Sequence, residues 1–315
     1  MSARTYPRRP SFEDVRGPGF SPFNLILALV LGGVIAVSFQ QSRVSLTEPF
    51  SPQNAKSVAR FVSGLFPPAT APDFLQTIGG LILETVFISV SGTVIAFVLA
   101  VPLALGALRT RGEETSRQSL GLPAWLLRWS IFGTSRMLLN LGRAIPELIW
   151  ALVFVVAVGL GPFPGVLALA VHSAGILGKL YAEMLESVDQ RVVEASRATG
   201  ASEAAVTLLA RVPLALPILL SYTLFRWECN MRAATVLGFV GAGGIGTQLS
   251  ISMKLFRYDE VLTLAIGIVL LVTLVDIVGS IIRARILDAP TITCVPDDLP
   301  VVRDRATGAF GRAEG

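Results

Sequence analysis

Long apolar runs alternate with short polar segments along most of the chain. A helix crosses the hydrocarbon core of a bilayer with about 20 predominantly apolar residues. Six runs approach or exceed this length and are predicted to span a membrane, at about residues 23–39, 80–108, 145–160, 166–185, 213–240 and 261–282. The pattern therefore predicts an all-α integral membrane protein with six transmembrane helices.

The polar segments define the domain organisation. We divide the chain into a disordered arm, a first transmembrane helix, an extracytoplasmic loop, a core transmembrane domain and a tail, at residues 1–22, 23–39, 40–79, 80–285 and 286–315. The first run follows a basic segment, so a signal-peptide core is the alternative there. We favour an uncleaved span, because the only sequence that resembles a cleavage site lies inside the run. A short amphipathic helix is expected at 55–66.

The positively charged residues indicate how the chain is inserted. With the N-terminus in the cytoplasm, the segments placed inside the cell carry 17 of the 26 Lys and Arg residues, and those placed outside carry five. Cytoplasmic loops of membrane proteins are enriched in these residues. Both termini are therefore predicted to be cytoplasmic.

Composition agrees with a membrane protein and excludes several functions. Only 15% of the residues are charged and the mean hydropathy is +0.66, whereas a soluble domain carries about 25% charged residues. The net charge of +4 follows from the cytoplasmic loops and requires no nucleic-acid partner. The single histidine and the two cysteines, Cys229 and Cys294, lack metal-ligand spacing. We expect no metal site and no disulfide.

Residues 238–246 read GFVGAGGIG. Gly241, Gly243 and Gly246 have the G-x-G-x-x-G spacing of a dinucleotide-binding turn, but that turn follows a β-strand. Here a predicted membrane helix precedes the glycines, which argues against NAD binding. Glycines at the end of a span indicate irregular backbone or close helix contact. We expect a re-entrant turn beside a pathway, with these three residues and Gly244 in an outer gate; a flexible linker is the alternative.

A polar, amphipathic segment at 188–213 lies between the fourth and fifth predicted spans. The tripeptide that starts at Glu194 is predicted to open a helix, Gly200 to end it, and Ser202 to cap a second short helix. A short exposed helix of this kind fits a groove on a partner protein. The alternative is an interfacial helix that lies on lipid.

This segment resembles the signature of ATP-binding-cassette (ABC) importer permeases, E-A-A-x3-G-x9-I-x-L-P. The matching positions hold Glu194, Ala195, Ser196, Gly200, Ala210, Val212 and Pro213. The second Ala, the Ile and the Leu of the signature are therefore replaced. Two longer stretches resemble phosphonate-import permeases in particular: RAIPELIWALVFVVAVGLGPFPGVLALAVHSAGILGKLYAEMLE from Arg143 and SYTLFRWECNMRAATVLGFVGAGGIG from Ser221. The likeness covers about residues 75–285.

The resemblance implies a type I ABC importer permease fold, similar to that of methionine permeases, in a bacterial inner membrane. It implies a homodimer, an extracytoplasmic substrate-binding protein and two cytoplasmic ATPase subunits that grip the helices at 189–207. ATP and Mg²⁺ would be bound by those ATPases, so this chain is expected to be no enzyme and to need no cofactor. It contains no G-x-x-x-x-G-K-[ST] phosphate loop. The coupling residues expected are Glu194, Ala195, Gly200, Ala201 and Ser202.

Other readings of the chain remain open at this point. Phosphite, hypophosphite and methionine permeases look similar, so the resemblance leaves the substrate undecided. A secondary transporter driven by an ion gradient often contains inverted repeats, and none is visible. An intramembrane enzyme needs a nucleophile or metal constellation, and His172 has no evident nucleophile partner. Only the importer interpretation explains the segment at 188–213.

Four polar side chains lie midway along the fifth predicted span: Arg226, Glu228, Asn230 and Arg232. Ionisable groups in a membrane face a cavity or a partner, because burying them alone is costly. Arg226 and Asn230 share one helix face. Glu228 and Arg232 share the opposite face, in the i,i+4 order that favours an ion pair. We expect one pair to line the path of an anion, where guanidinium groups suit phosphoryl oxygens, and the other to lock helix packing; a wholly structural role for all four is the alternative.

Three further polar residues lie in or beside the predicted spans. Arg143 is another candidate for the path, or a side chain that extends to the membrane interface. His172 is expected to be a hydrogen-bonded packing residue rather than a proton relay, and Asp276 to pair with a neighbour.

Overall fold

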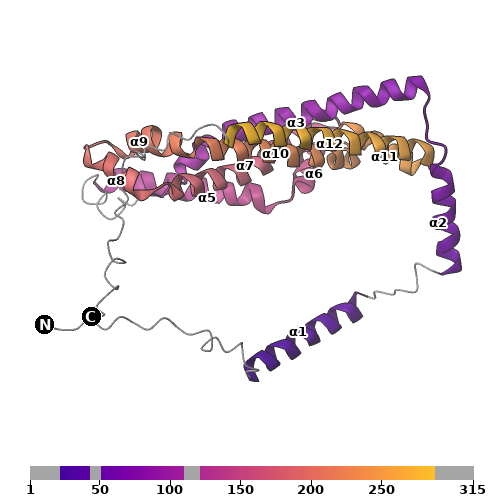
Figure 1. The fold of residues 1–315 in the computed structure, drawn as a ribbon, viewed down its shortest axis with the longest axis horizontal. Helices are drawn as coiled ribbons and strands as arrows, with labels where there is room; N and C mark the ends of the chain where they lie inside the picture. Colours follow the sequence, from indigo (N-terminus) through magenta and orange to yellow (C-terminus); the bar gives the residue numbers. More distant parts are fainter. Residues whose placement is uncertain (1–21, 43–50, 110–120, 288–315) are drawn as a thin grey trace, which may run out of the picture. The chain divides into compact units, whose positions relative to one another are not determined.

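The structure, a computed structural model, describes residues 22–42, 51–109 and 121–287. Every element in these ranges is a helix (Figure 1), which confirms the predicted all-α class. By its internal contacts the chain divides into two units, Met1–Ser63 and Gly64–Gly315. Almost all of the predicted N-terminal segment (1–22) and of the predicted tail (286–315) lies outside the described residues, and so does Cys294. The exceptions are residue 22, which begins the first helix, and residues 286–287, which end the last.

Two helices begin the described chain. Helix α1, Pro22–Gln41, is apolar on all sides and is long enough to span a membrane. Helix α2, Pro52–Leu65, is the amphipathic helix expected at 55–66. Its apolar residues Val58, Phe61, Val62 and Leu65 follow the i, i+3, i+4, i+7 spacing of one helix face.

The remaining spans belong to the second unit. Helices α3 (Pro72–Gly106), α7 (Pro162–Ser187) and α12 (Tyr258–Leu287) each exceed the length that a bilayer requires. A continuous helical segment, Glu203–Val240, supplies another span. It consists of α9 (Glu203–Val206), a π-helical turn (Thr207–Arg211), α10 (Val212–Leu237) and a 3₁₀ turn (Gly238–Val240). These four helical segments confirm the spans predicted at 80–108, 166–185, 213–240 and 261–282. Each segment begins earlier than predicted and is longer than the predicted span.

Helices α3 and α7 pack together along the centre of this unit. Small buried residues one turn apart, Ala96, Ala100 and Ala104, form the contact face of α3. A Cβ atom on Gly92 would lie only 2.8 Å from the Cβ of Leu169 in α7. Small side chains let transmembrane helices approach closely, so that van der Waals packing holds them together.

The third predicted span differs in the structure. Instead of one helix at 145–160, α5 (Leu122–Ala144) and α6 (Glu147–Val158) meet at a bend of 93°. The 12 residues of α6 extend about 18 Å, less than the ~30 Å hydrocarbon thickness, so α6 crosses a membrane only together with α5. Pro146 explains the break: it lacks an N–H group and forces Ile145 out of the helical conformation, to φ −90° and ψ 122°.

Two ends of the second unit carry the predicted functional segments. Helices α8 (Gln190–Ala198) and α9 lie at one end, and α11 (Ile245–Lys254) lies at the other (Figure 1). The long helices α3, α7, α10 and α12 run between these two ends.

Candidate functional site

The segment between α7 and α10, residues 188–211, is called the arm from here on, and it is distinct from the N-terminal segment at 1–22. It consists of a helix, a glycine turn and a second helix. Asp189 caps α8, since its Oδ1 accepts a hydrogen bond of 2.9 Å from the backbone N–H of Arg191. Gly200 has a left-handed φ of 80°, which favours glycine and ends the first helix. Ser202 Oγ accepts a bond of 3.3 Å from the Ala205 N–H. The predicted break and the predicted cap are both confirmed.

One expectation for the arm was wrong. Glu194 was expected to open the first helix, whereas α8 begins four residues earlier at Gln190. The capping carboxylate of Asp189 explains this earlier start. Glu194 and Ala195 are consequently mid-helix and exposed, Ser202 is exposed, and Ala201 is half-buried.

An ion pair closes the glycine turn of the arm. Arg197 Nε and Nη2 donate to the two carboxylate oxygens of Glu203 at 2.6 and 3.1 Å. A bidentate pair of this kind fixes the angle between its partners. Helices α8 and α9 are therefore held as one unit.

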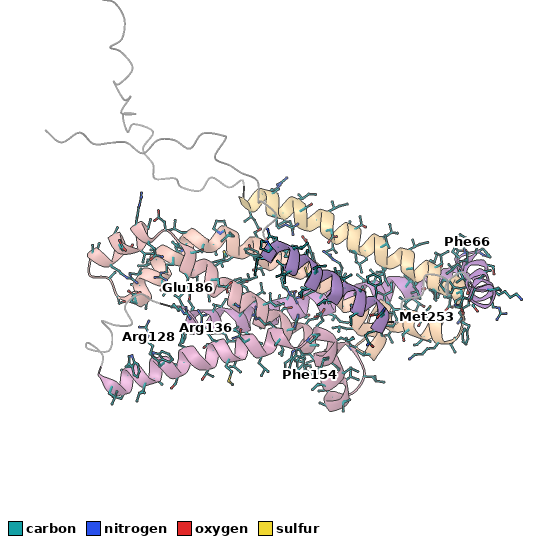
Figure 2. All side chains as sticks on the ribbon, turned by 90° about the horizontal axis from the view of Figure 1, so that it is seen from below. Phe66, Arg128, Arg136, Phe154, Glu186 and Met253 are labelled. Carbon is teal, nitrogen blue, oxygen red and sulfur yellow. The ribbon has the colours of Figure 1, made fainter. Side chains whose placement is uncertain are left out.

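A second polar cluster joins the base of the arm to the bundle. Glu186 Oε1, at the end of α7, accepts hydrogen bonds from Arg136 Nη2 at 3.0 Å and from the Arg109 backbone N–H at 2.7 Å. Arg136 Nε also donates to the Ala107 carbonyl at 3.2 Å. Arg136 and Glu186 lie near the end of the bundle that carries the arm (Figure 2). This cluster ties the ends of α3 and α7 to α5, four residues before α8 begins.

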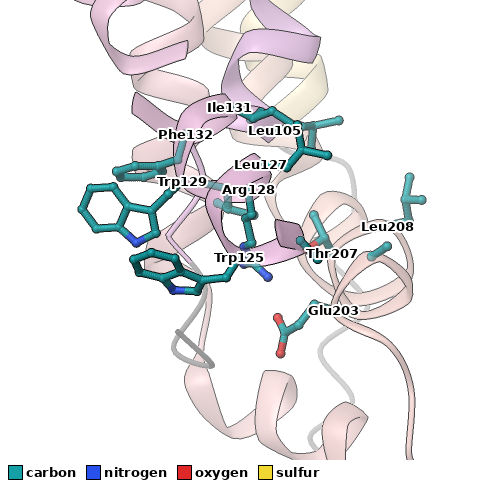
Figure 3. A pocket seen from close by; sticks show the side chains of 14 residues that line it. Leu105, Trp125, Leu127, Arg128, Trp129, Ile131, Phe132, Glu203, Thr207 and Leu208 are labelled. Atoms are coloured by element: carbon teal, nitrogen blue, oxygen red, sulfur yellow. The ribbon is translucent and has the colours of Figure 1, made fainter. Parts of the chain in front are cut away.

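An apolar cavity of about 460 Å³ lies beside the arm. Trp125, Trp129 and Phe132 line it from α5, and Glu203 and Leu208 face it from α9 and the π-helical turn (Figure 3). Aromatic residues of this type gather at membrane–water interfaces. Their position agrees with an interface at this end of the bundle.

A chain of hydrogen bonds crosses the bundle through the polar face of α10. Arg226 Nε donates to Ser173 Oγ at 3.0 Å, and Ser173 Oγ donates to Asn230 Oδ1 at 2.7 Å. Asn230 Nδ2 donates to Thr93 Oγ1 at 2.9 Å. Arg226 and Asn230 therefore share a face, as predicted. Asn230 is completely buried between α3 and α7, whereas Arg226 is only half-buried.

The predicted ion pair between Glu228 and Arg232 is wrong. Glu228 is buried and pairs with Arg283 of α12. Arg232 Nη2 lies 3.4 Å from Oδ1 of Asp276, also of α12. Asp276 thereby has the neighbour that the sequence left unnamed. Glu228 and Arg232 thus both pair with residues of α12, so contacts between helices replace the local i,i+4 pair.

Arg232 also borders a cavity of about 300 Å³, together with Glu147 and Cys229. Glu147 comes from α6, and the other two residues come from α10. Arg226 lies within electrostatic range of the Glu147 carboxylate. Arg143 is exposed on the last turn of α5. The structure thus brings Arg226, Arg232 and Glu147 to one region.

The glycine segment forms a turn that packs α11 back against α10. Gly241, Gly243 and Gly244 have φ values of 85°, 80° and 73°, all in the left-handed region. Gly246 serves a different purpose, because its own Cβ would lie 1.8 Å from the carbonyl oxygen of Thr235. The expected irregular backbone with close helix contact is confirmed. The re-entrant turn beside a pathway and the gate remain predictions.

Side chains of α3 hold the start of α11 in place. Glu84 Oε1 accepts a bond of 3.2 Å from the Gly244 N–H, and Thr85 Oγ1 accepts one of 2.9 Å from the Ile245 N–H. A carboxylate at a helix N-terminus is favourable. Neither residue was predicted from the sequence as part of a site, and neither were Ser173 and Glu186. Their partners lie far away in sequence, and only Glu84, an acid within an apolar run, gives a signal.

A helical membrane bundle with a structured helix pair between two spans agrees with a transport permease. The family model described as "Binding-protein-dependent transport system inner membrane component" matches residues 118–288, more than half of the chain. The chain belongs to this family. Its membership confirms that the chain is a membrane transport subunit and not an enzyme.

The relatives and the solved structures agree with this family. The phosphite transport system permease protein PtxC of Stutzerimonas stutzeri is 42% identical over 202 residues, which cover 64% of this chain and 68% of that protein. The phosphate-import permease protein PhnE of Mycolicibacterium smegmatis is 34% identical over 232 residues, 74% of this chain and 41% of that protein. The MetNI methionine ABC transporter, in an inward facing conformation, matches with a TM-score of 0.57 at 22% identity, over 69% of this chain and 99% of that chain. This likeness confirms the type I importer permease fold.

Proposed function

We propose that the chain is the permease subunit of an ABC importer that carries a phosphonate or a related phosphorus oxyanion. The names of its relatives, a phosphite permease and a phosphate-import permease, support this substrate class. The observation that carries the ATP-driven mechanism is the arm. A helix pair fixed by the Arg197–Glu203 ion pair, with Glu194 and Ala195 exposed, presents a rigid surface to a partner.

We infer the partners from the resemblance to importer permeases, and this arm supports the inference for the ATPases. Two copies of the chain form a homodimer, two ATPase subunits each hold one arm, and a binding protein delivers substrate from the opposite side. Both termini then lie in the cytoplasm of a bacterial cell, as the Lys and Arg bias indicates. ATP-driven movement of the arm passes through Glu186 to α3 and α5, and the spans change access as rigid bodies.

Two arginines of α10 are proposed to face the anion. The Arg232 side chain is 52% exposed and Arg226 is half-buried. Their charges lower the barrier for an anion in a poorly hydrated path, and Arg143 offers a further cation nearby. Asn230 and Glu228 are proposed to lock the packing, because each is buried and bonded to a neighbouring helix.

The glycine turn is proposed as the outer gate. The Gly161 N–H donates to the Gly241 carbonyl at 3.0 Å, which joins the α6–α7 loop to this turn. Gly243 would bring a Cβ within 2.6 Å of Glu84 Oε1. A bulky side chain there must displace the contact that holds α11.

The experiment is ATPase stimulation in lipid vesicles. The chain is co-purified with its cognate ATPase and mixed with the binding protein, with or without 2-aminoethylphosphonate, methylphosphonate or phosphite. We expect stimulation by one loaded form of the binding protein, and its loss in Glu194→Lys. Asp73→Lys is the matched control, because it makes the same charge reversal at an exposed residue in the first turn of α3.

The variants separate coupling from general damage. Loss in Glu194→Lys with normal stimulation in Asp73→Lys supports docking through the arm. Failure of any ATPase to co-purify, with no effect of Glu194→Lys on transport, would refute the importer proposal.

A further inference from the structure

The bend between α5 and α6 is held by the only histidine of the chain. His172 Nδ1 lies 2.9 Å from the Ile145 carbonyl oxygen and 3.3 Å from that of Gly142. On the other side of the ring, Nε2 lies 3.2 Å from Oε2 of Glu147. The imidazole is buried and therefore makes these contacts without competition from bulk water. These contacts confirm the expectation that His172 is a hydrogen-bonded packing residue.

These contacts fix the number of protons at the corner. A carbonyl oxygen only accepts, so the hydrogen of a neutral ring must be on Nδ1. Nε2 is then an acceptor, and it faces a carboxylate oxygen that is also an acceptor. The two lone pairs repel each other unless one more proton lies between Nε2 and Oε2.

We propose that Nε2 of His172 carries this additional proton and donates it to the Glu147 carboxylate, so that the two residues share it, and that His172 is the positioning residue that holds the Glu147 carboxylate at the cavity wall. The pair is then neutral as a whole. The consequence for transport rests on the proposed function: a neutral pair leaves the positive charges of α10 to act on the anion. An unshared Glu147 carboxylate would oppose it.

The charged groups around the corner support this account. From α10, Arg226 lies within electrostatic range of Glu147 and Cys229, and Arg232 borders the same cavity as Glu147. From α12, Asp276 is occupied by Arg232. Arg143 is on the last turn of α5. Among the described groups at this cavity, Glu147 is thus the carboxylate whose charge the histidine controls.

The presence of one histidine allows a direct test. The chain is purified with a histidine-free tag and labelled with ¹⁵N-histidine, so the imidazole signals come from His172 alone. At pH 7.5 we expect both ring nitrogens of the wild type to give the signals of protonated nitrogen. In Glu147→Gln we expect a neutral ring with its hydrogen on Nδ1, because the amide donates to Nε2. Glu183→Gln, an acid-to-amide change at another position of α7, should leave the wild-type signals unchanged.

A neutral ring in the wild type, with one nitrogen unprotonated, would overturn the shared proton. This readout needs no ATPase, binding protein or substrate. Its failure is therefore distinct from failure of the proposed function.

Uptake by the reconstituted importer tests the positioning role. His172→Gln leaves an uncompensated carboxylate near the path, and we expect uptake to fall by about tenfold. The double variant His172→Gln, Glu147→Gln removes that charge and should recover most of the loss. A purely structural clamp predicts that the double variant is as poor as the single one, and that result would overturn the proposal.

Discussion

Gly246 is where a single methyl group should do the most damage to the proposed gate. The Cβ of an alanine there would lie 1.8 Å from the Thr235 carbonyl oxygen, where contacts below 3.0 Å are essentially never found. The obstructing atom is backbone in α10, so no side-chain rotation relieves the clash. Helix α11 must move away by about 1.2 Å to reach a distance of 3.0 Å.

The cost of this movement has two parts. Overpacking costs about 1–3 kcal/mol. The shift also stretches the hydrogen bonds from Gly244 and Ile245 to Glu84 and Thr85, now 3.2 and 2.9 Å long. Each such bond contributes roughly 0.5–1.5 kcal/mol. We expect Gly246→Ala to lower the stability of the chain by about 2–6 kcal/mol.

The assay is the midpoint temperature for loss of monodisperse protein in detergent. Gly246→Ala should melt at least about 4 °C below the wild type. Gly267→Ala is the matched control, since its Cβ would make only an ordinary contact, 3.5 Å from Ile245. It should melt at or above the wild type, because alanine favours a helix by about 1 kcal/mol over glycine. Equal melting of the two variants would refute the reasoning.

Three further variants test the contacts between helices. Arg283→Gln leaves the buried Glu228 carboxylate unpaired and should destabilise the chain by about 3–5 kcal/mol; adding Glu228→Gln should restore much of the melting temperature, and no rescue would contradict the pairing. Asn230→Ala removes one hydrogen-bond partner from each of two buried hydroxyl groups, those of Ser173 and Thr93, and should cost about 1–3 kcal/mol in the same melt, so an unchanged midpoint would speak against the network. Glu186→Gln weakens the link to Arg136 and should lower uptake per ATP hydrolysed while the ATPase still co-purifies; unchanged coupling would remove Glu186 from the transmission.

Local sequence signals predicted much of this fold. Apolar runs located the long helices, because length and hydropathy alone decide whether a helix spans a bilayer. Gly200 and Ser202 predicted the turn and the cap of the arm. Both effects are local in sequence, because the left-handed φ belongs to Gly200 itself and Ser202 accepts a hydrogen bond from a residue only three positions later. The glycines at 241–246 indicated irregular backbone for the same reason.

Contacts between distant residues were not predictable in this way. Glu228 has an arginine at i+4, but the structure pairs it with Arg283, 55 residues further along. The i,i+4 rule describes an isolated helix, and packing against α12 overrides it. The α5–α6 bend was missed because the predicted span began at Ile145, so residues 122–144 were not predicted as a helix that leads into it. The clamp by His172 comes from another helix.

Uptake into proteoliposomes tests the central claim most directly. The complex is reconstituted with ATP on the side of the arm, the loaded binding protein on the other, and labelled methylphosphonate or phosphite. The account predicts accumulation that requires both ATP and the binding protein, and that is abolished by Arg226→Gln while the complex stays assembled. Accumulation driven by an ion gradient without ATP, or unchanged uptake in Arg226→Gln, would contradict it.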